Sequence, residues 1–367
     1  MSKARLDLRA LSLDLWRACL GALAIAASSG LGAAPLPVPV IRPEGAPLEV
    51  SKAFAFDEKT RRSASGIACA AGAMPRMCLV VFDEGVKAQF ATLGAHSLAA
   101  AGDPIALVGS GGELDAEGAS TDGEYFYAIG SHSVKRKDCA SNPASRYVVR
   151  FKARWTAAAS GAPTLAIDAL QPTGRLWELM TRDPYLGRHV DGCLGAGQGG
   201  RLQQMARRPG LNIEGIAVMG GRLYVGFRGP SEAGVVPVYS VEAAALFDGT
   251  DPKPKLAKLR VGSRQGIRDM VAADGAMLLL IGPDDHDPAG APKWHVAEWR
   301  GGGASASTVQ PRVLATLDLR DLSFGGCFKE LKPEALAIVE LSASGYKIVV
   351  LSDGVCDGGP LIFNVPR

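Results

Sequence analysis

The stretch EGIAVMGGRLYVGFRGP (214–230) decides the fold, because four other stretches of the chain repeat its pattern. Each copy has a polar residue, a small residue, a few apolar residues, a turn, and an apolar run that ends in a polar residue. The other copies are SGIACA…CLVVFDEG (65–70 and 78–85), EGASTDGEYFYAIGSHS (117–133), RDMVAADGAMLLLIGPDD (268–285) and EALAIVELSASGYKIVVLSDG (334–354). Such a repeat indicates one supersecondary unit used several times, as in the blades of a β-propeller.

Further strand-like segments follow each copy and complete the unit. In chain order they are 88–98 and 103–109, 146–155 and 163–170, 235–241 and 255–261, and 294–299 and 312–319. The sequence therefore predicts an all-β propeller of five four-stranded blades. A stretch of different texture, 171–212, carries helical spacing and is predicted to be a partly helical insertion between blades two and three. The alternative is a degenerate sixth blade.

The N-terminal region is expected to lie outside the propeller. Residues 1–34 combine a basic start with a short apolar stretch, which is typical of a signal peptide. Residues 35–46 are a Pro-rich lead-in, and 47–367 are predicted to form a single propeller domain. Its first strand, 47–56, is expected to pair with the last blade near 360–367 and so close the ring. A retained N-terminal anchor is the alternative to a cleaved signal.

Composition supports an exported protein in the periplasm or outside the cell. The formal charge is only +3 and no basic stripe occurs, so nucleic acid is not an expected partner. Beyond the first 34 residues no segment is long and apolar enough to cross a membrane. Six cysteines remain there, and an even number in an exported chain indicates disulfides.

One disulfide pairing is predicted from a turn between two expected strands. Cys69 and Cys78 flank that turn and are expected to be bonded. The other four cysteines, Cys139, Cys193, Cys327 and Cys356, allow three connectivities. We favour Cys139–Cys193 and Cys327–Cys356, because each pair is then local to one region.

Two columns of polar residues run through the repeats. The first column opens each inner strand and comprises Ser65, Glu117, Glu214, Arg268 and Glu334. The second column closes the next strand and comprises Asp83, His132, Arg228, Asp284 and Asp353. In an antiparallel hairpin the start of one strand lies beside the end of the next. Both columns are therefore predicted to meet around one mouth of the central channel.

These charges allow three kinds of chemistry. A small ligand, anionic or polar, could be bound by Glu214, Arg228, Arg268, Asp269, Glu334 and Asp353, with the arginines gripping an anion. A cation such as Ca²⁺ could be held by carboxylates among Asp83, Glu117, Glu214 and Glu334. His132 or Glu117 could act as a general base. The structural alternative is that these residues tie neighbouring blades together by ion pairs.

Other motifs carry less weight. DDHDP (284–288) has the composition of an acidic metal loop, but a solvated turn is the preferred interpretation. No G-x-S-x-G, H-E-x-x-H or phosphate-binding loop motif occurs in the sequence. Asp269 stands where the other copies have Gly or Ala, which is a departure from the repeat.

The phrases NIEGIAV (212–218), LYVGFRGP (223–230), GIRDMV (266–271), KPEALAI (332–338) and VVLSDG (349–354) together resemble a bacterial domain-of-unknown-function family, number 3616. The resemblance covers roughly residues 60–360 and implies a secreted or periplasmic propeller. More distantly, the E-G-I-A phrase is similar to propellers grouped as esterase-like or phytase-like, which would imply phosphoester hydrolysis by analogy of fold. Ser65 and Arg268 stand where Glu would complete a carboxylate ring.

Three functions stay open at this point. The first is an exported propeller that binds a small anionic or polar ligand at the channel mouth. The second is a metal-dependent ester or phosphoester hydrolase at the same face. The third is a non-catalytic scaffold that binds another envelope protein through its loops and the insertion. The sequence does not decide whether the protein is an enzyme.

Overall fold

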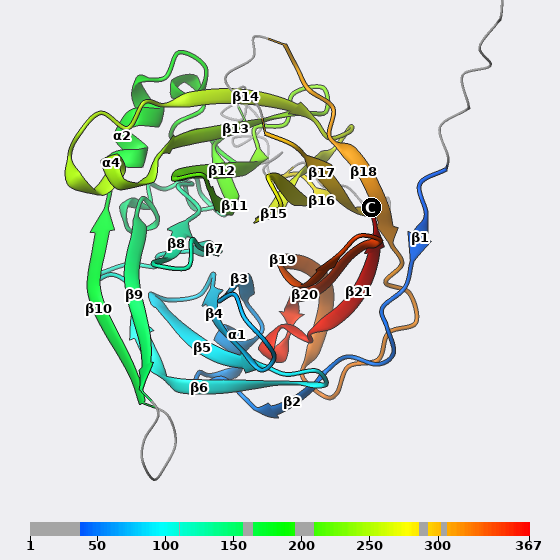
Figure 1. Ribbon diagram of the computed structural model, residues 1–367. Helices are drawn as coiled ribbons and strands as arrows, with labels where there is room; N and C mark the ends of the chain where they lie inside the picture. The colour runs from blue at the N-terminus through cyan, green and yellow to red at the C-terminus, as the bar shows by residue number, and fades with distance from the viewer. Residues whose placement is uncertain (1–36, 110, 157–163, 195–208, 286–292, 302–306) are drawn as a thin grey trace, which may run out of the picture. The chain divides into compact units, whose positions relative to one another are not determined.

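Five sheets stand around a common axis in the computed structural model, which describes residues 37–367 except 110, 157–163, 195–208, 286–292 and 302–306 (Figure 1). The architecture is the predicted five-bladed β-propeller. Each sequence repeat forms the two inner strands of one blade. The innermost strands are β3 (Ala64–Cys69), β7 (Ala116–Thr121), β11 (Asn212–Met219), β15 (Gln265–Ala273) and β19 (Phe328–Ser342). The predicted signal peptide, 1–34, lies outside the described residues.

The blades are antiparallel sheets of consecutive strands. The second strands are β4 (Arg76–Phe82), β8 (Phe126–Gly130), β12 (Arg222–Gly229), β16 (Ala276–Pro283) and β20 (Gly345–Val355). The outer strands are β5 (Lys87–Leu93), β6 (Ser97–Ala106), β9 (Val148–Thr156), β10 (Thr164–Thr173), β13 (Val235–Glu242), β14 (Lys255–Arg260), β17 (Trp294–Trp299), β18 (Arg312–Leu317) and β21 (Leu361–Pro366). Blade five differs from the expected four strands, because it is built from β19, β20 and β21 alone.

The inner strands pack closely around the axis, and each contacts the next until β19 meets β3. A Cβ added at Gly66 would lie 2.7 Å from the Ala119 amide nitrogen on the neighbouring inner strand. One added at Gly215 would lie 3.1 Å from the amide nitrogen of Met270. The repeat therefore needs a small residue here, because a side chain would push neighbouring blades apart. Between blades the core is apolar; Val81 and Phe90, for example, pack with Ala128 and Val149.

Asp269 occupies this small-residue position in blade four. Its carboxylate accepts hydrogen bonds from the amides of Met270 (2.7 Å) and of Leu336 on the next inner strand (2.6 Å). The side chain is fully buried, and burial raises the pKa of Asp269 well above its usual value. The departure from the repeat thus joins blades four and five by a side-chain bridge in place of direct backbone packing.

The lead-in crosses three blades along their outer edges. β1 (Val40–Ile41) pairs in parallel with β18 of blade four, and β2 (Glu49–Lys52) pairs in parallel with β6 of blade one. Between them, the amides of Glu44 and Leu48 donate to carbonyls at Ile362 and Pro360 of blade five. Our expectation that the first strand pairs with the last blade is therefore wrong for β2, whose ladder partner is β6 of blade one. Blade five holds the lead-in by the two backbone hydrogen bonds and by Lys347 and Asn364, which bind the Glu44 carboxylate.

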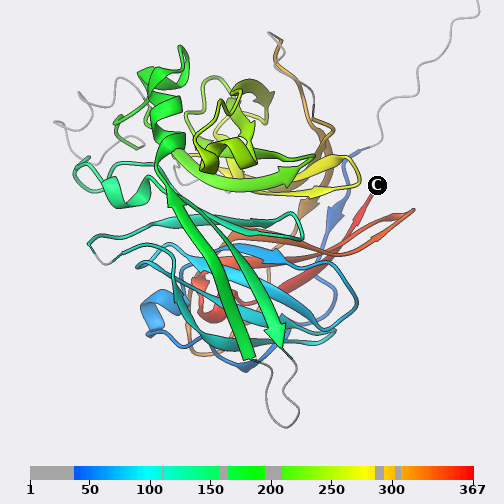
Figure 2. The same ribbon diagram turned by 60° about the vertical axis from the view of Figure 1, so that its left-hand side comes forward.

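Short helices and turns join the strands. The insertion contains α2 (Arg175–Arg182) and the 3₁₀ turn η2 (Leu186–Arg188), and Figure 2 shows α2 where β10 ends. The other helical elements of the described residues are α1 (Glu58–Arg61), η1 (Pro143–Ser145), α4 (Ala243–Asp248) and η3 (Cys356–Gly358). Among the described residues, no helix has the length and apolarity needed to span a membrane.

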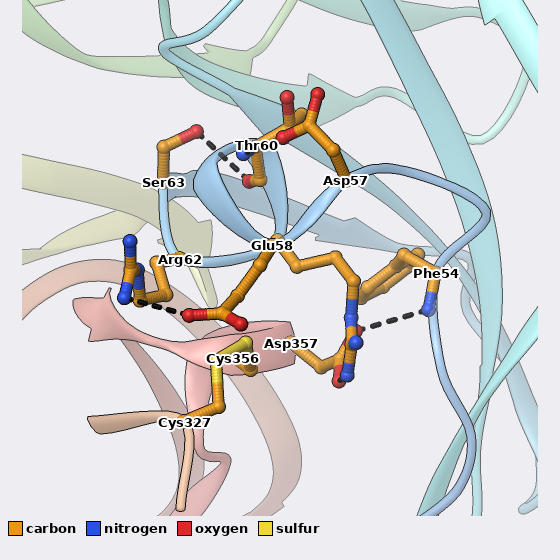
Figure 3. The surroundings of a disulfide bond; sticks show 10 residues. Phe54, Asp57, Glu58, Thr60, Arg62, Ser63, Cys327, Cys356 and Asp357 are labelled. Atoms are coloured by element: carbon orange, nitrogen blue, oxygen red, sulfur yellow. Dashed lines mark hydrogen bonds and ion pairs between the residues drawn. A yellow bond between two sulfur atoms is a disulfide. The ribbon is translucent and has the colours of Figure 1, made fainter.

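Three disulfides tie these connections to the blades, and they are the three pairings favoured from the sequence. Cys69–Cys78 links β3 to β4, whereas Cys139–Cys193 links the loop after β8 to the insertion. The third, between Cys327 and Cys356, fixes η3 next to α1 (Figure 3). There Asp357 accepts from the Phe54 amide and the Arg61 guanidinium, both at 3.0 Å, so blade five is bound to the start of blade one.

We predict that the lead-in stabilises the ring where the first and last blades meet. A chain beginning at Ala53 loses five backbone hydrogen bonds that a chain beginning at Val38 retains, donated by residues 44, 48, 49, 316 and 318. At a net ~0.5–1.5 kcal/mol each, the expected loss in unfolding free energy is about 2.5–7.5 kcal/mol. Urea unfolding of the two chains measures it, and equal midpoints and slopes would contradict the prediction.

Candidate functional site

A cavity of about 660 Å³ opens where the inner strands begin and the second strands end. The structure places six of the residues singled out from the sequence in its wall: Asp83, Glu117, Glu214, Arg228, Glu334 and Asp353. Residues that the sequence analysis missed also line it, among them Glu113, Asp115, Lys135, Arg136, Lys137, Asn212, Glu330 and Lys332. The cavity is therefore a polar mouth of the channel with charges of both signs.

Beta-bulges direct the first column toward this mouth. In every blade the pairing of the two inner strands skips one residue, and the skipped residues are Ser65, Glu117, Glu214, Arg268 and Glu334. A bulged residue has no partner in the ladder, so its side chain can leave the alternation of the strand. The first column is thus a ring of bulged residues, each followed by the small or bridging residue that packs against the next blade.

The register also corrects two members of the second column. In blade one, Phe82 on the second strand pairs with Ala64, which precedes the bulged residue, and Asp83 follows Phe82. The residues at the equivalent position of the other blades are Ser131, Arg228, Gly282 and Asp353. His132 and Asp284 were therefore aligned one and two residues too late. Gly282 cannot be replaced easily, since an added Cβ would lie 2.2 Å from the Trp294 ring.

His132 accordingly lies away from the cavity wall. It is buried, its Nδ1 is 2.8 Å from the Gly130 carbonyl, and its ring centre is 6.3 Å from that of Trp177 in the insertion. Burial lowers the pKa of His132 to about 4. Asp284 is also buried, and its backbone carbonyl accepts from Arg228 at 3.4 Å. Neither residue is among those that line the cavity.

Arg268 is the centre of an ion-pair network behind the wall. It is only 1% exposed, and its Nε lies 3.0 Å from Glu214 Oε2. It also donates to Glu334 Oε1 and, at 3.3 Å, to the Pro283 carbonyl. One buried guanidinium thus holds carboxylates from β11 and β19 and joins blades three, four and five at the axis.

Arg228 continues the network along the wall. Its guanidinium lies 3.0 Å from Glu214 Oε1 and 3.3 Å from Asp285 Oδ1. Asp285 also accepts from Arg136 at 2.9 Å and from Asn212 at 3.1 Å. Burial opposes ionisation of Asp285, but Arg228 and Arg136 outweigh it and keep its pKa below the usual value. Both arginines predicted to grip an anion are therefore already occupied by carboxylates.

Asp285, the last described residue of the acidic DDHDP segment (284–288), is thus part of the network, not of a solvated turn. Asp285 has a side chain only 4% exposed, although the sequence analysis interpreted 284–288 as solvent-facing. The remainder of that segment, 286–288, lies outside the described residues. The signal in the sequence that could have identified Asp285 is its position two residues after β16, a strand that ends at the channel mouth.

Other carboxyl groups in the wall carry raised pKa values. Burial raises the pKa of Glu117 well above its usual value, and the charges of Glu214 and Asp115 add to this. Burial also raises the pKa of Asp83, with further contributions from Glu334 and Asp353. The pKa of Glu334 rises to about 7 through burial, although Arg268 opposes the shift.

The partners of these carboxyls differ. Glu334 has Arg268 and, at 3.4 Å, the Ser65 hydroxyl, whereas Asp115 accepts from the hydroxyl of Ser131. Asp83 Oδ1 is buried and accepts no hydrogen bond from any described residue. Glu117 forms no ion pair or side-chain hydrogen bond within the described part of the chain. Asp353 is held by Lys332 at 3.3 Å.

The carboxyls do not form a compact metal-binding group. Across the described residues, no three Asp, Glu, His or Cys side chains are grouped so that they could hold one metal ion. Two of the four candidates for Ca²⁺ binding, Glu214 and Glu334, instead direct oxygens at Arg268. The other two candidates, Glu117 and Asp83, form no ion pair with any described Lys, Arg or His residue.

The model of one protein family matches the chain over residues 83–153 and 148–357, and it is described as "Protein of unknown function (DUF3616)". The chain belongs to this family. No curated protein matches it at a significant level. The family assignment confirms the resemblance found in the sequence and agrees with the observed propeller.

Solved propellers are similar to the chain at low identity. The GH43 endo-arabinanase of Bacillus licheniformis is 11% identical, with 88% of this chain and 96% of that chain covered and a TM-score of 0.36. The α-L-arabinanase of Cellvibrio cellulosa complexed with arabinohexaose is 10% identical, with coverage of 83% and 91% and a TM-score of 0.41. The Cps50 (Swd1) β-propeller domain of Myceliophteria thermophila is 10% identical, with 82% of each chain covered and a TM-score of 0.34. None of these likenesses bears on activity.

Replacing Arg268 with Met should leave buried carboxylates without their cation. We expect the unfolding free energy at neutral pH to fall by about 3–5 kcal/mol, as for other broken buried pairs. Because Arg268 lowers the pKa of Glu334, its loss raises that pKa further, and the folded variant then binds a proton that the unfolded chain releases. The loss of stability should therefore be larger at pH 8 than at pH 5.

Urea unfolding at the two pH values measures both effects. Arg182→Met, at a side chain 77% exposed, is the control for loss of an arginine. Adding Glu334→Gln to the Arg268 variant should recover part of the loss at pH 8. A variant as stable as the wild type at both values would show that the network contributes nothing to folding.

Proposed function

We propose that this member of the DUF3616 family binds a small polar ligand in the cavity at the channel mouth. The observation that carries the proposal is Glu117, whose bulged side chain lies in the wall of a cavity of about 660 Å³ without a protein partner. A group that is costly to bury and has no partner in the protein is suited to one supplied by a ligand. Asp83, which lines the same cavity and has a buried Oδ1 without a hydrogen bond, is a second group that a ligand could satisfy.

The ion-pair network assigns the two arginines a role different from the anion binding expected from the sequence. Arg228 and Arg268 neutralise Glu214, Glu334 and Asp285, so they position carboxylates and do not offer a free guanidinium to an anion. Glu214 and Asp353 are likewise held by cations. The ligand contacts that we propose are Asp83, Glu117 and the outer face of Glu334, and Asp269 has a structural role between two strands.

A hydrolytic role is the second candidate, and one observation favours it. The pKa of Glu334 is about 7, which suits a group that takes and returns a proton at neutral pH. Glu117, with a pKa that is also raised, would face it across the cavity. His132 is not part of this candidate, because its ring packs against Trp177.

The three disulfides support export to an oxidising compartment, the periplasm or the extracellular space. We propose such a location together with cleavage of the N-terminal signal. Mass spectrometry of the mature protein from a periplasmic fraction tests this proposal, since the cleaved chain would begin beyond the apolar stretch.

Glu117→Gln should stabilise the protein, and more so at high pH. The folded pKa of Glu117 is above the unfolded value, so the folded state binds an extra proton and the contribution of this group to stability falls as pH rises between the two values. The amide removes that cost without changing the shape of the side chain. We expect a higher Tm than the wild type at pH 8 and a smaller difference at pH 5. Glu178→Gln, on the exposed face of α2, should change Tm at neither pH.

Ligand binding itself is tested by a thermal-shift screen of small amines, sugars, carboxylates and phosphates at neutral pH. Compounds that raise the Tm of the wild type should lose that effect in Glu117→Gln and retain it in Glu178→Gln. If every compound found acts equally on both variants, the cavity is not the binding site and the proposal fails. Hydrolysis of nitrophenyl ester or phosphate substrates that depends on Glu334 would favour the second candidate instead.

A further inference from the structure

The carboxyl groups of the cavity wall form two sets, one ion-paired to cations and one without an ion pair among the described residues. Eight carboxyl and five cationic side chains line it. On the side of blades three to five, Arg228 is bound to Glu214 and Asp285, and Lys332 is bound to Glu330 at 2.6 Å and Asp353 at 3.3 Å. These cations are therefore committed to protein carboxylates.

Blades one and two supply the second set. The loop after β8 also brings Lys135, Arg136 and Lys137 to the wall, and Arg136 is bound to Asp285. Asp83 follows β4, Asp115 precedes β7, and Glu117 is the bulged residue of β7. The Ser131 and Ser133 hydroxyls donate to Asp115, and a hydrogen bond from the Ser63 side chain partly offsets the raised pKa of Asp83. Glu117 accepts from no described side chain. The buried Asp83 Oδ1 in particular has no donor. Oxygens of this kind call for a ligand that brings hydrogen-bond donors.

We infer that the ligand of this cavity is an organic amine whose ammonium group lies among Asp83, Asp115 and Glu117. The inference rests on the proposed function and specifies its ligand. An ammonium group has three donors, no acceptor and a positive charge, so it satisfies these carboxyls where an anion would be repelled. The volume of the cavity suits the body of an organic molecule and exceeds what one bare cation fills.

Binding of such a cation should be linked to proton release. Glu117 faces Asp115 on its own blade, Asp83 from blade one, Glu214 from blade three and Glu334 from blade five. The cations on the same wall are Arg228, Lys332 and Lys135–Arg136–Lys137, the last three on the loop after β8; Glu113, Glu330 and Asp353 complete its charged groups. Because the neighbouring carboxyls raise one another's pKa, an ammonium group ionises them, and its affinity should increase with pH.

The experiment is calorimetric titration of the full chain with α,ω-diamines from diaminoethane to diaminohexane, with the diols of the same length as neutral controls. We expect at least one diamine to bind at pH 8 and to bind more weakly at pH 7, by up to about tenfold, which is the limit for one released proton. The same diamine should bind at least about tenfold more weakly to Glu117→Gln and equally well to Glu178→Gln. Asp83→Asn is a second variant in case the first fails to fold.

The outcomes separate this inference from the proposed function. If diols or neutral sugars bind as tightly as diamines and lose affinity in Glu117→Gln, the cavity is a ligand site but the ammonium inference is wrong. If calcium chloride binds with one-to-one stoichiometry and displaces the diamine, the site is a metal site and the inference is also wrong. If neither diamines nor neutral probes depend on Glu117 or Asp83, both proposals fail.

Discussion

Close packing of five inner strands around one axis is the constraint on which the rest of the structure depends. Where the strands approach, the backbone of one lies against the backbone of the next, and a Cβ at Gly66 or Gly215 would collide with it. The residue immediately before each such position is forced into a bulge, so its side chain leaves the ladder at the mouth of the channel. One backbone requirement, repeated five times, thus produces both the closed ring and the polar mouth.

Once the bulges bring these side chains together, their charges must be compatible. A ring of five carboxylates would be strongly self-repelling in a site of restricted solvent access. Arg268 replaces the carboxylate in blade four and binds Glu214 and Glu334 on either side, while Ser65 replaces it in blade one and binds Glu334. Arg268 and Ser65, the two departures from Glu in the first column, therefore reduce the repulsion among the remaining Glu residues.

The repeat was sufficient to predict the five blades, because turn residues and apolar runs recur at the same places in each copy. The first column was also predictable, since one polar residue always precedes the small residue. The second column was predicted correctly in blades one, three and five but not in blades two and four, because only the observed strand pairing separates Ser131 from His132 and Gly282 from Asp284. Asp115 and Asp285 lie just outside strands, where alternation gives no prediction. The missing fourth strand of blade five and the path of the lead-in depend on long-range pairing that no local pattern specifies.

The asymmetry of the mouth is difficult to explain by folding alone. The Arg268 network stabilises blades three to five. Asp83, Asp115 and Glu117 form no ion pair within the described residues, although the basic loop 135–137 of blade two lies in the same wall. Instead these groups keep their burial cost, and Glu117 and Asp83 face the cavity with raised pKa values. Natural sequences accept such local costs mainly at functional sites. The half of the ring that is least favourable to the folded protein is therefore the half where an external partner would contribute most.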